Sequence, residues 1–308
     1  MKSLTICVIG LLLLAPGCSR KPEIMSGRMD RGLVIVLPGI EGRSASNVSI
    51  CEGLAAGGVK SAVELYDWTS AFTPLLTPFY NERAEGRNRR KASELAASIV
   101  RYRTAHPDKP VILVGQSGGS AIAIWTVESL PPGVAVDGVI LLAASLSHDY
   151  MLDTALAKTR RGIVNFYSAR DFVFLGIGTT VTGTMDGRHT TSAGRDGFDV
   201  PRRVGPNVYN RLFQIPWQKR MAQTGSIGLH LSSGAPVFVA NYVSPFVLLP
   251  EWNGDIVQRV LHDESVGSIL RSTVKPISPT TSRPAASSST AASGGVGTAG
   301  PAQPAVQP

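Results

Sequence analysis

Short runs of consecutive apolar residues recur along the chain, and longer stretches with apolar positions at helical spacing lie between them. A run of this kind, uncharged and bounded by Gly or Pro, predicts a strand that is buried on both faces of a sheet. Four runs fit the description: residues 33–37, 111–114, 138–143 and 163–168. Because strands buried on both faces are typical of parallel sheets, the pattern indicates an α/β protein.

Helical periodicity occupies the intervals between these runs. Residues 87–103 carry apolar side chains at helical spacing, and residues 120–127 form an apolar helical stretch between two expected strands. Strand, helix and strand together span residues 111–143, which favours a parallel pair joined by a right-handed crossover. The pattern also predicts helices at 49–56, 235–249 and 254–261, and strands at 61–66 and 207–216. The predicted fold class is α/β, with a mostly parallel central sheet and helices on both faces.

Residues 115–119 read Gly-Gln-Ser-Gly-Gly and stand directly between an expected strand and an expected helix. In that setting Gly-x-Ser-x-Gly is typical of a nucleophile elbow, a tight turn that presents its serine, here Ser117. Gly115 and Gly119 are small enough to let other backbone segments approach the turn closely. The start of the following helix would supply N–H groups and a positive dipole end beside the serine oxygen. The alternative is an ordinary glycine-rich turn.

On these residues and their order, the chain resembles the α/β-hydrolase family over about residues 31–250. The resemblance is one of motif order and not a match to a single characterised member. It implies an α/β-hydrolase fold and a triad in the chain order serine, acid, histidine, which Ser117, Asp171 and His230 fit. It also implies an oxyanion hole made of the backbone N–H groups of Ile40 and Gly118. The expected function is hydrolysis of an ester-type bond by a carboxylesterase-like or lipase-like serine hydrolase.

Other residues compete for the roles of base and acid. His189 is the main rival of His230, but it precedes the expected last strand, whereas the family places its histidine after that strand. His148 precedes the expected acid and so breaks the family order as well. Asp149 is an alternative to Asp171 as the acid, because some family members take it from the preceding strand end.

A long excursion separates the expected acid from the expected base. Residues 176–205 are rich in Gly, Thr, Arg and Asp and show little periodicity. A segment of this length is either a cover over the active site or an exposed loop.

The composition and the motifs argue against nucleic-acid binding and against a bound metal or cofactor. The 308-residue chain has a formal net charge of +8, but only 6% of its residues are aromatic, and they are not interleaved with the basic ones. A basic solvated surface is therefore favoured over nucleic-acid binding. The five histidines share no ligand spacing, and Cys51 stands alone beyond the first 18 residues. Since the glycine motif also lacks the lysine of a phosphate-binding loop, we expect no metal and no cofactor.

The two ends of the chain differ from its middle. Residues 1–18 combine an early lysine with an apolar run and end in Ala-Pro-Gly-Cys, which resembles a bacterial lipoprotein signal with Cys18 as the lipidated residue. Ala15 departs from that pattern, which prefers leucine there. The expected organisation is a signal peptide at 1–18, a tether at 19–30, an α/β-hydrolase domain at 31–270 and a disordered tail at 271–308. We expect a protein held at the bacterial cell envelope by an N-terminal lipid anchor; ordinary secretion is the alternative.

Two other functions fit the same residues. A protein of this fold can be a non-catalytic binding or envelope protein, since a fold alone carries no activity. An acyltransferase would use the same serine, acid and histidine. For a hydrolase, the expected partner is a small-molecule or lipid ester, whose chain length the sequence does not define.

Overall fold

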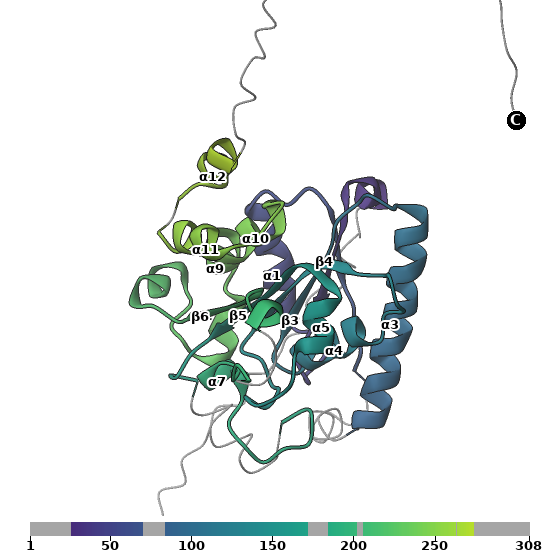
Figure 1. Ribbon diagram of the computed structural model, residues 1–308. Coiled ribbons are helices and arrows are strands. Elements are labelled where there is room, and N and C mark those ends of the chain that lie inside the picture. Colours follow the sequence, from purple (N-terminus) through teal and green to yellow (C-terminus); the bar gives the residue numbers. More distant parts are fainter. Residues whose placement is uncertain (1–25, 70–83, 172–183, 202–205, 263, 274–308) are drawn as a thin grey trace, which may run out of the picture. The chain divides into compact units, whose positions relative to one another are not determined.

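Six parallel strands form the central sheet of the computed structural model, which describes residues 26–69, 84–171, 184–201, 206–262 and 264–273 (Figure 1). The strands are β1 (Leu33–Leu37), β2 (Ala62–Leu65), β3 (Val111–Gln116), β4 (Val136–Leu142), β5 (Thr159–Tyr167) and β6 (Leu212–Pro216). Their order across the sheet is β2-β1-β3-β4-β5-β6, and every neighbouring pair is parallel. The four apolar runs of the sequence lie in β1, β3, β4 and β5, so these predicted strands are confirmed.

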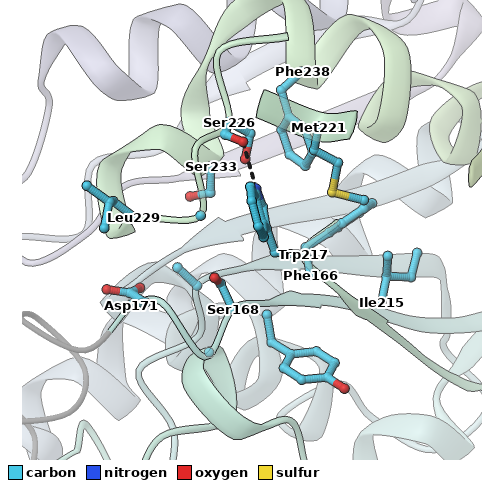
Figure 2. Close-up of a pocket in the computed structure, with 14 residues that line it drawn as sticks. Phe166, Ser168, Asp171, Ile215, Trp217, Met221, Ser226, Leu229, Ser233 and Phe238 are labelled. Carbon is cyan, nitrogen blue, oxygen red and sulfur yellow. Dashed lines mark hydrogen bonds between the residues drawn. The ribbon is translucent and has the colours of Figure 1, made fainter. Parts of the chain in front are cut away.

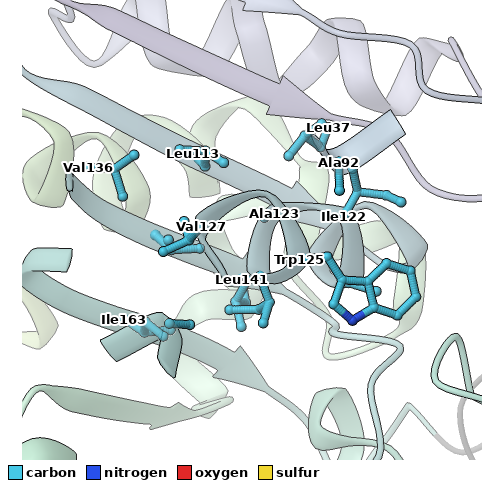
Figure 3. Close-up of a cluster of buried hydrophobic side chains, with 14 of the residues drawn as sticks. Leu37, Ala92, Leu113, Ile122, Ala123, Trp125, Val127, Val136, Leu141 and Ile163 are labelled. Carbon is cyan, nitrogen blue, oxygen red and sulfur yellow. The ribbon is translucent and has the colours of Figure 1, made fainter. Parts of the chain in front are cut away.

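Successive side chains of a strand point to opposite faces of the sheet, so each apolar run supplies two separate cores. In β1, Leu33 and Ile35 face one core, whereas Val34 and Val36 face the other. The first core lies under α3 (Glu85–Ala105), α4 (Gly118–Glu128) and α5 (Asp153–Ala157). Figure 3 shows part of it, with Trp125 on the apolar helix α4.

The second core lies under α1 (Ala45–Ala56), α9 (Pro236–Phe238), η5 (Val239–Val243), α10 (Ser244–Leu248) and α11 (Gly254–Leu261). The three segments α9, η5 and α10 follow one another and form the helix predicted at 235–249. Their middle segment is a π turn just before Pro245, whose missing N–H interrupts the regular helical ladder. Helices thus cover both faces of the parallel sheet, which confirms the predicted fold class.

Two elements differ in extent from the prediction. Helix α1 begins four residues before residue 49, because Ser44 caps it: the Ser44 N–H donates to Asn47 Oδ1 at 2.9 Å. The strand predicted at 207–216 is shorter, since α8 (Pro206–Tyr209) precedes β6. Tyr209 is buried there, and its hydroxyl accepts the Leu152 N–H at 3.0 Å. The apolar residues before β6 therefore pack a helix and do not extend the sheet.

The last described helix is α12 (Val266–Thr273), so the expected domain end at residue 270 falls within it. Cys18, the remainder of the expected leader and residues 274–308 lie outside the described residues. Within the described ranges, no helix is both long and apolar enough to cross a membrane.

Candidate active site

The backbone at Ser117 is held in a conformation that residues other than glycine rarely adopt. Its φ of 52° and ψ of −123° fall at the junction of β3 and α4, where the chain reverses from strand to helix. Two contacts with the end of β4 and the residues that follow it hold this turn: the Ser117 N–H donates to Leu142 O at 2.9 Å, and the Ser145 N–H donates to Ser117 O at 3.2 Å. The sharp turn predicted from the Gly-x-Ser-x-Gly motif is confirmed.

The two outer glycines of the motif are required by close backbone packing. A Cβ at Gly115 would lie 2.6 Å from Gly119 O, inside the turn itself. A Cβ at Gly119 would overlap the carbonyl oxygens of Leu37 and Pro38, at the end of β1. These positions therefore let α4 start directly against the neighbouring strand.

Three side chains from distant parts of the chain meet at the elbow. His230 Nε2 lies 2.9 Å from Ser117 Oγ, and His230 Nδ1 lies 2.8 Å from Asp171 Oδ2. All three residues are buried, with 9% of Ser117, 7% of His230 and 2% of Asp171 exposed. A ring with its proton on Nδ1 would donate to the carboxylate and would leave Nε2 able to accept a proton from the serine hydroxyl. These are the three residues that the family resemblance implied.

The sheet positions Asp171, and a glycine-rich loop positions His230. Asp171 follows β5 and closes a turn in which its N–H donates to Ser168 O at 2.9 Å. The carboxyl ends of parallel strands lie at one edge, so this turn comes close to the elbow that follows β3. His230 opens the short helix η4 (His230–Gly234), after Gly228 with a φ of 85°. A Cβ at Gly228 would lie 3.0 Å from Ser168 Oγ, so this glycine lets the two loops meet.

The loop after β1 packs against the first residue of α4. A Cβ at Gly118 would lie 2.8 Å from Ile40 Cγ2, so Ile40 and Gly118 are immediate neighbours. The loop is anchored behind by Trp68, whose indole N–H donates to Pro38 O at 2.8 Å. The Gly118 N–H belongs to the first turn of a helix, where backbone donors have no acceptor within the helix. The two residues that the resemblance implied for an oxyanion hole are thus in contact with each other.

A buried polar network behind this loop was not anticipated from the sequence. Gln116 Oε1 accepts a hydrogen bond from Asn47 Nδ2 at 2.9 Å, and Asn47 Nδ2 also lies 3.4 Å from Glu41 Oε1. The network connects the elbow, helix α1 and the loop that carries Ile40. Gln116 is the residue before Ser117 in the Gly-x-Ser-x-Gly motif, a position that the motif leaves open, so the sequence did not predict these contacts.

The rival residues do not take part in this hydrogen-bonded series. All five histidines lie in the described ranges, and His230 alone is hydrogen-bonded to Ser117. His189 is exposed, and His148 Nδ1 lies 3.0 Å from Asp199 Oδ2. The Asp149 carboxylate pairs with Arg188 on the surface.

Part of the long excursion at 176–205 packs beside the site; residues 176–183 and 202–205 lie outside the described ranges. Met185 is buried, and its Sδ lies 3.3 Å from the position of a Cβ at Gly118. Ser192 pairs with Ser147 in an isolated antiparallel bridge. The described part of the excursion is therefore packed against the elbow and the chain after β4.

A small pocket lies beside Asp171, between the ends of β5 and β6 and the loop that leads to His230 (Figure 2). Its apolar lining includes Ala143, Phe166, Ile215, Trp217, Met221 and Phe238. The Trp217 indole N–H donates to Ser226 O at 2.7 Å, which ties the loop to the end of β6. Since Asp171 lines the pocket and Ser117 does not, the pocket lies on the Asp171 side of these three residues.

In the described part of the chain, no three His, Cys, Asp or Glu side chains are grouped as a metal site would need.

The sequence matches no protein-family model and no curated protein. Among solved structures, the chain is similar to lipase B of Aspergillus fumigatus, with a TM-score of 0.47 and 13% identity over 79% of this chain and 62% of the lipase. The chain thus spans less than two thirds of that lipase. It is also similar to a dienelactone hydrolase-like phosphotriesterase from metagenomic libraries (TM-score 0.37, 14% identity, 77% of this chain and 86% of that one). The pyrethroid hydrolase PytH has a TM-score of 0.36 and 14% identity over 71% of this chain and 98% of its own.

Proposed function

We propose that the protein is a serine hydrolase that cleaves an ester-type bond. The proposal is carried by the hydrogen-bonded series from Asp171 through His230 to Ser117, with distances of 2.8 and 2.9 Å. A serine hydroxyl is a weak nucleophile unless a base takes its proton, and the base needs a group that fixes its tautomer. The arrangement supplies both conditions in one buried site.

In the proposed reaction, Ser117 Oγ attacks the ester carbonyl carbon while its proton passes to His230 Nε2. The Asp171 carboxylate stabilises the imidazolium and keeps the other ring proton on Nδ1. His230 then returns its proton to the departing alkoxide, so that an alcohol leaves and an acyl-serine ester forms. Water attacks this ester with His230 again as base, and a carboxylic acid is released.

We assign the oxyanion hole to the backbone N–H groups of Ile40 and Gly118. The contact between these residues and the position of Gly118 in the first turn of α4 support the assignment. One such donor contributes on the order of 3 kcal/mol to transition-state stabilisation, so the placement of the backbone matters as much as the triad.

A fluorophosphonate probe and a series of aryl esters of increasing chain length test the proposal. We expect labelling of the folded protein, loss of labelling and of ester hydrolysis in Ser117→Ala, and no change in Ser93→Ala on the exposed side of α3. A folded wild-type protein that neither reacts with the probe nor hydrolyses any ester would be a binding protein, and the proposal would be wrong.

We further propose that the chain is lipid-anchored through Cys18 at the bacterial envelope. The support is the apolar run of the first 18 residues and the small Gly17 before the cysteine. Two acyl chains anchor a protein stably in a membrane, whereas one chain does not. The wild-type protein should therefore partition into the detergent phase, and the Cys18→Ser variant should stay in the aqueous phase. A wild-type envelope protein without lipid contradicts the anchor but leaves the hydrolase proposal intact.

A further inference from the structure

Basic residues gather at the edge of the sheet where its parallel strands begin, which is the edge opposite Ser117. Five of the six strands have a Lys or Arg one or two positions before their first residue. These residues are Arg31, Lys60, Lys109, Lys158 and Arg211, before β1, β2, β3, β5 and β6 respectively. The same turns contain two acids, Asp30 and Asp108, so positive charge predominates.

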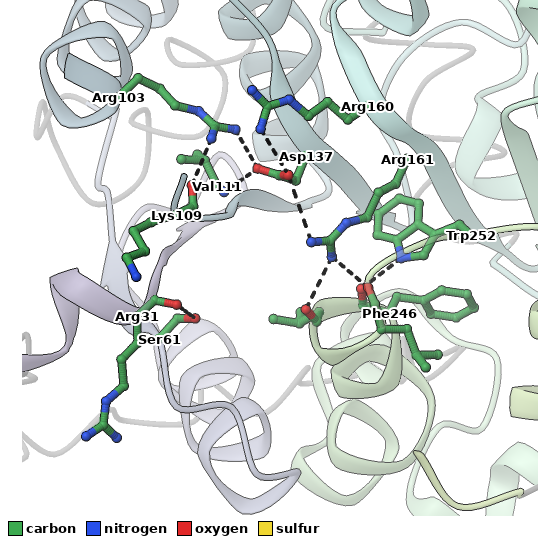
Figure 4. Close-up of polar contacts among 12 residues, drawn as sticks. Arg31, Ser61, Arg103, Lys109, Val111, Asp137, Arg160, Arg161, Phe246 and Trp252 are labelled. Carbon is green, nitrogen blue, oxygen red and sulfur yellow. Dashed lines mark hydrogen bonds and ion pairs between the residues drawn. The ribbon is translucent and has the colours of Figure 1, made fainter. Parts of the chain in front are cut away.

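Three further arginines, from α3 and β5, gather around the start of the remaining strand, β4, and add to this excess. Its Asp137 is buried, accepts hydrogen bonds from Arg103 and from the Val111 N–H, and pairs with Arg160 and Arg161 at 3.6 and 3.9 Å (Figure 4). One carboxylate therefore faces three guanidinium groups. Burial and then the neighbouring Arg103 and Arg160 lower the pKa of Arg161, against the opposing effect of Asp137.

Several of these bases are available to an external partner. Lys158 and Arg211 donate hydrogen bonds to backbone carbonyl groups, so their charged groups are used within the domain. Arg31, Lys60 and Lys109 are exposed, and 55% of the Arg160 side chain is exposed. We call these four residues the basic edge. In Figure 4, Arg31, Lys109 and Arg160 surround the starts of the central strands.

The chain also enters the domain at this edge. Helix η1 (Ser26–Arg31) precedes β1 and is held there by the Tyr102 hydroxyl, which donates to Met29 O at 2.6 Å. In Figure 1, η1 (purple) lies at the end of the domain opposite α7 (Ala193–Asp196), which packs at the carboxyl end of β5. Cys18 lies eight positions before Ser26, and eight residues span at most about 28 Å. A lipid at Cys18 would therefore keep the basic edge close to the bilayer.

We propose that the basic edge docks on anionic phospholipid headgroups of the membrane that carries the anchor, so that the Ser117 edge faces away from it. The proposal rests on the proposed anchor and, for its functional consequence, on the proposed hydrolase. Lys and Arg near an anionic surface bind by charge attraction within about a Debye length. Strands of five residues or more separate the two edges by at least about 15 Å. The substrate would then come from the aqueous side and not from the anchoring bilayer.

The first test measures binding of the full chain carrying Cys18→Ser to vesicles of phosphatidylglycerol and of phosphatidylcholine. We expect preference for phosphatidylglycerol, weakened by salt and reduced at least about 100-fold by the triple change Arg31→Glu, Lys60→Glu, Lys109→Glu. The matched control, Arg90→Glu, Arg188→Glu, Lys219→Glu, changes net charge equally away from the basic edge. Equal losses in the two variants, or no preference for phosphatidylglycerol, would overturn the proposal.

The second test measures orientation in the lipid-anchored protein on a Cys51→Ala background. A fluorophore is placed on Lys109→Cys at the basic edge or on Leu231→Cys beside His230, and energy transfer to an acceptor-labelled lipid is compared. We expect stronger transfer from position 109. Stronger transfer from 231 would mean that the exposed Ile227, Leu229 and Leu231, with 47%, 46% and 55% exposure, face the bilayer instead. Hydrolysis of a soluble aryl ester, measured in parallel, reports separately on the proposed function.

Discussion

Gln116, the residue before the elbow serine, shares a buried hydrogen bond with Asn47 of α1, 69 positions earlier in the chain. Asn47 is fully buried, and its Oδ1 accepts from both the N–H and the hydroxyl of Ser44, at 2.9 and 2.8 Å. One amide thus joins the start of α1, the elbow and, through Glu41, the loop that carries Ile40. Because Asn47 is fully buried, we expect it to act by positioning the proposed oxyanion hole and not by contact with substrate.

Asn47→Ala should lower kcat about tenfold and leave KM nearly unchanged, because it loosens the Ile40 loop against the elbow. The change also removes the 2.9 Å hydrogen bond to the buried Gln116 amide, which keeps only its longer contacts with Ser46 Oγ at 3.2 and 3.4 Å. Together with the loss of the acceptor for Ser44 at the start of α1, this should lower the free energy of unfolding by about 1–3 kcal/mol. Ester kinetics and urea unfolding measure the two effects, with Ser49→Ala on the same helix as control. A variant with reduced stability but wild-type kcat would assign Asn47 a structural role only.

His230→Ala should lower kcat at least about a thousandfold and match Ser117→Ala, because members of a triad act as a unit. His189→Ala should retain most activity, since that side chain is exposed. Steady-state kinetics on one soluble aryl ester compare the three variants. If His189→Ala were the inactive one, the excursion at 176–205 would carry the base.

The elements that could be predicted are those with local signals. β1 and β3 are nearly unbroken apolar runs, and Ser117 lies inside a five-residue motif, so neighbouring residues suffice to find them. Ser117 and His230 lie 113 positions apart in the chain, and no local pattern predicts that they are hydrogen-bonded. That pairing was expected only from the order of residues in the family. The fold class was predictable because buried parallel strands leave a strong hydrophobic signal.

The features that could not be predicted depend on contacts between distant polar residues. Asn47 in α1 and Arg103 in α3 look like ordinary solvated helix positions until their partners, 69 and 34 positions away, are known. The start of α1 was missed for a similar reason, because its first turn is capped by Ser44 and carries polar residues without an apolar period.

The Cys51 thiol should react slowly with alkylating reagents in the folded protein. Its burial in α1 raises its pKa to about 11, from an ordinary 9.0, so little thiolate exists at pH 8.5. Mass spectrometry of the peptide that contains Cys51, after iodoacetamide treatment with and without urea, measures this directly. Equal alkylation under both conditions would show that the thiol is accessible and unshifted.

The same shift predicts a pH dependence of stability. Between pH 9 and about 11 the unfolded chain releases the thiol proton while the folded chain keeps it, so stability falls as pH rises through this window. Below pH 9 this contribution is fully present. Urea unfolding at pH 8 and pH 10.5 should show a smaller decrease in Cys51→Ala than in wild type.

Removal of residues 274–308 should leave the melting temperature and activity unchanged, whereas removal of 264–308 should destabilise the domain. Ile269 of α12 is fully buried in the second core, and Arg259 holds the helix through Glu264 and Ser272. Loss of one buried Ile side chain alone typically costs about 2–5 kcal/mol. Thermal unfolding of the two truncated chains provides the comparison, and equal melting temperatures would mean that α12 is not part of the stable domain.

The contact between Gly118 and Ile40 allows the proposed oxyanion hole to be tested through a clash and its relief. In Gly118→Ala the added methyl lies 2.8 Å from Ile40 Cγ2, so Ile40 must shift away from the elbow, and we expect the loop that carries it to follow. We expect kcat to fall about 10- to 1,000-fold, as when an oxyanion donor is displaced, while KM changes little. Ile40→Ala alone removes the side chain but keeps the backbone N–H, so it should retain most activity. The double variant Gly118→Ala, Ile40→Ala removes the clash and should recover most of the lost kcat, a coupling that independent sites do not show. If Gly118→Ala were fully active, or if the two effects simply added, the contact between Gly118 and Ile40 would not position the proposed oxyanion hole.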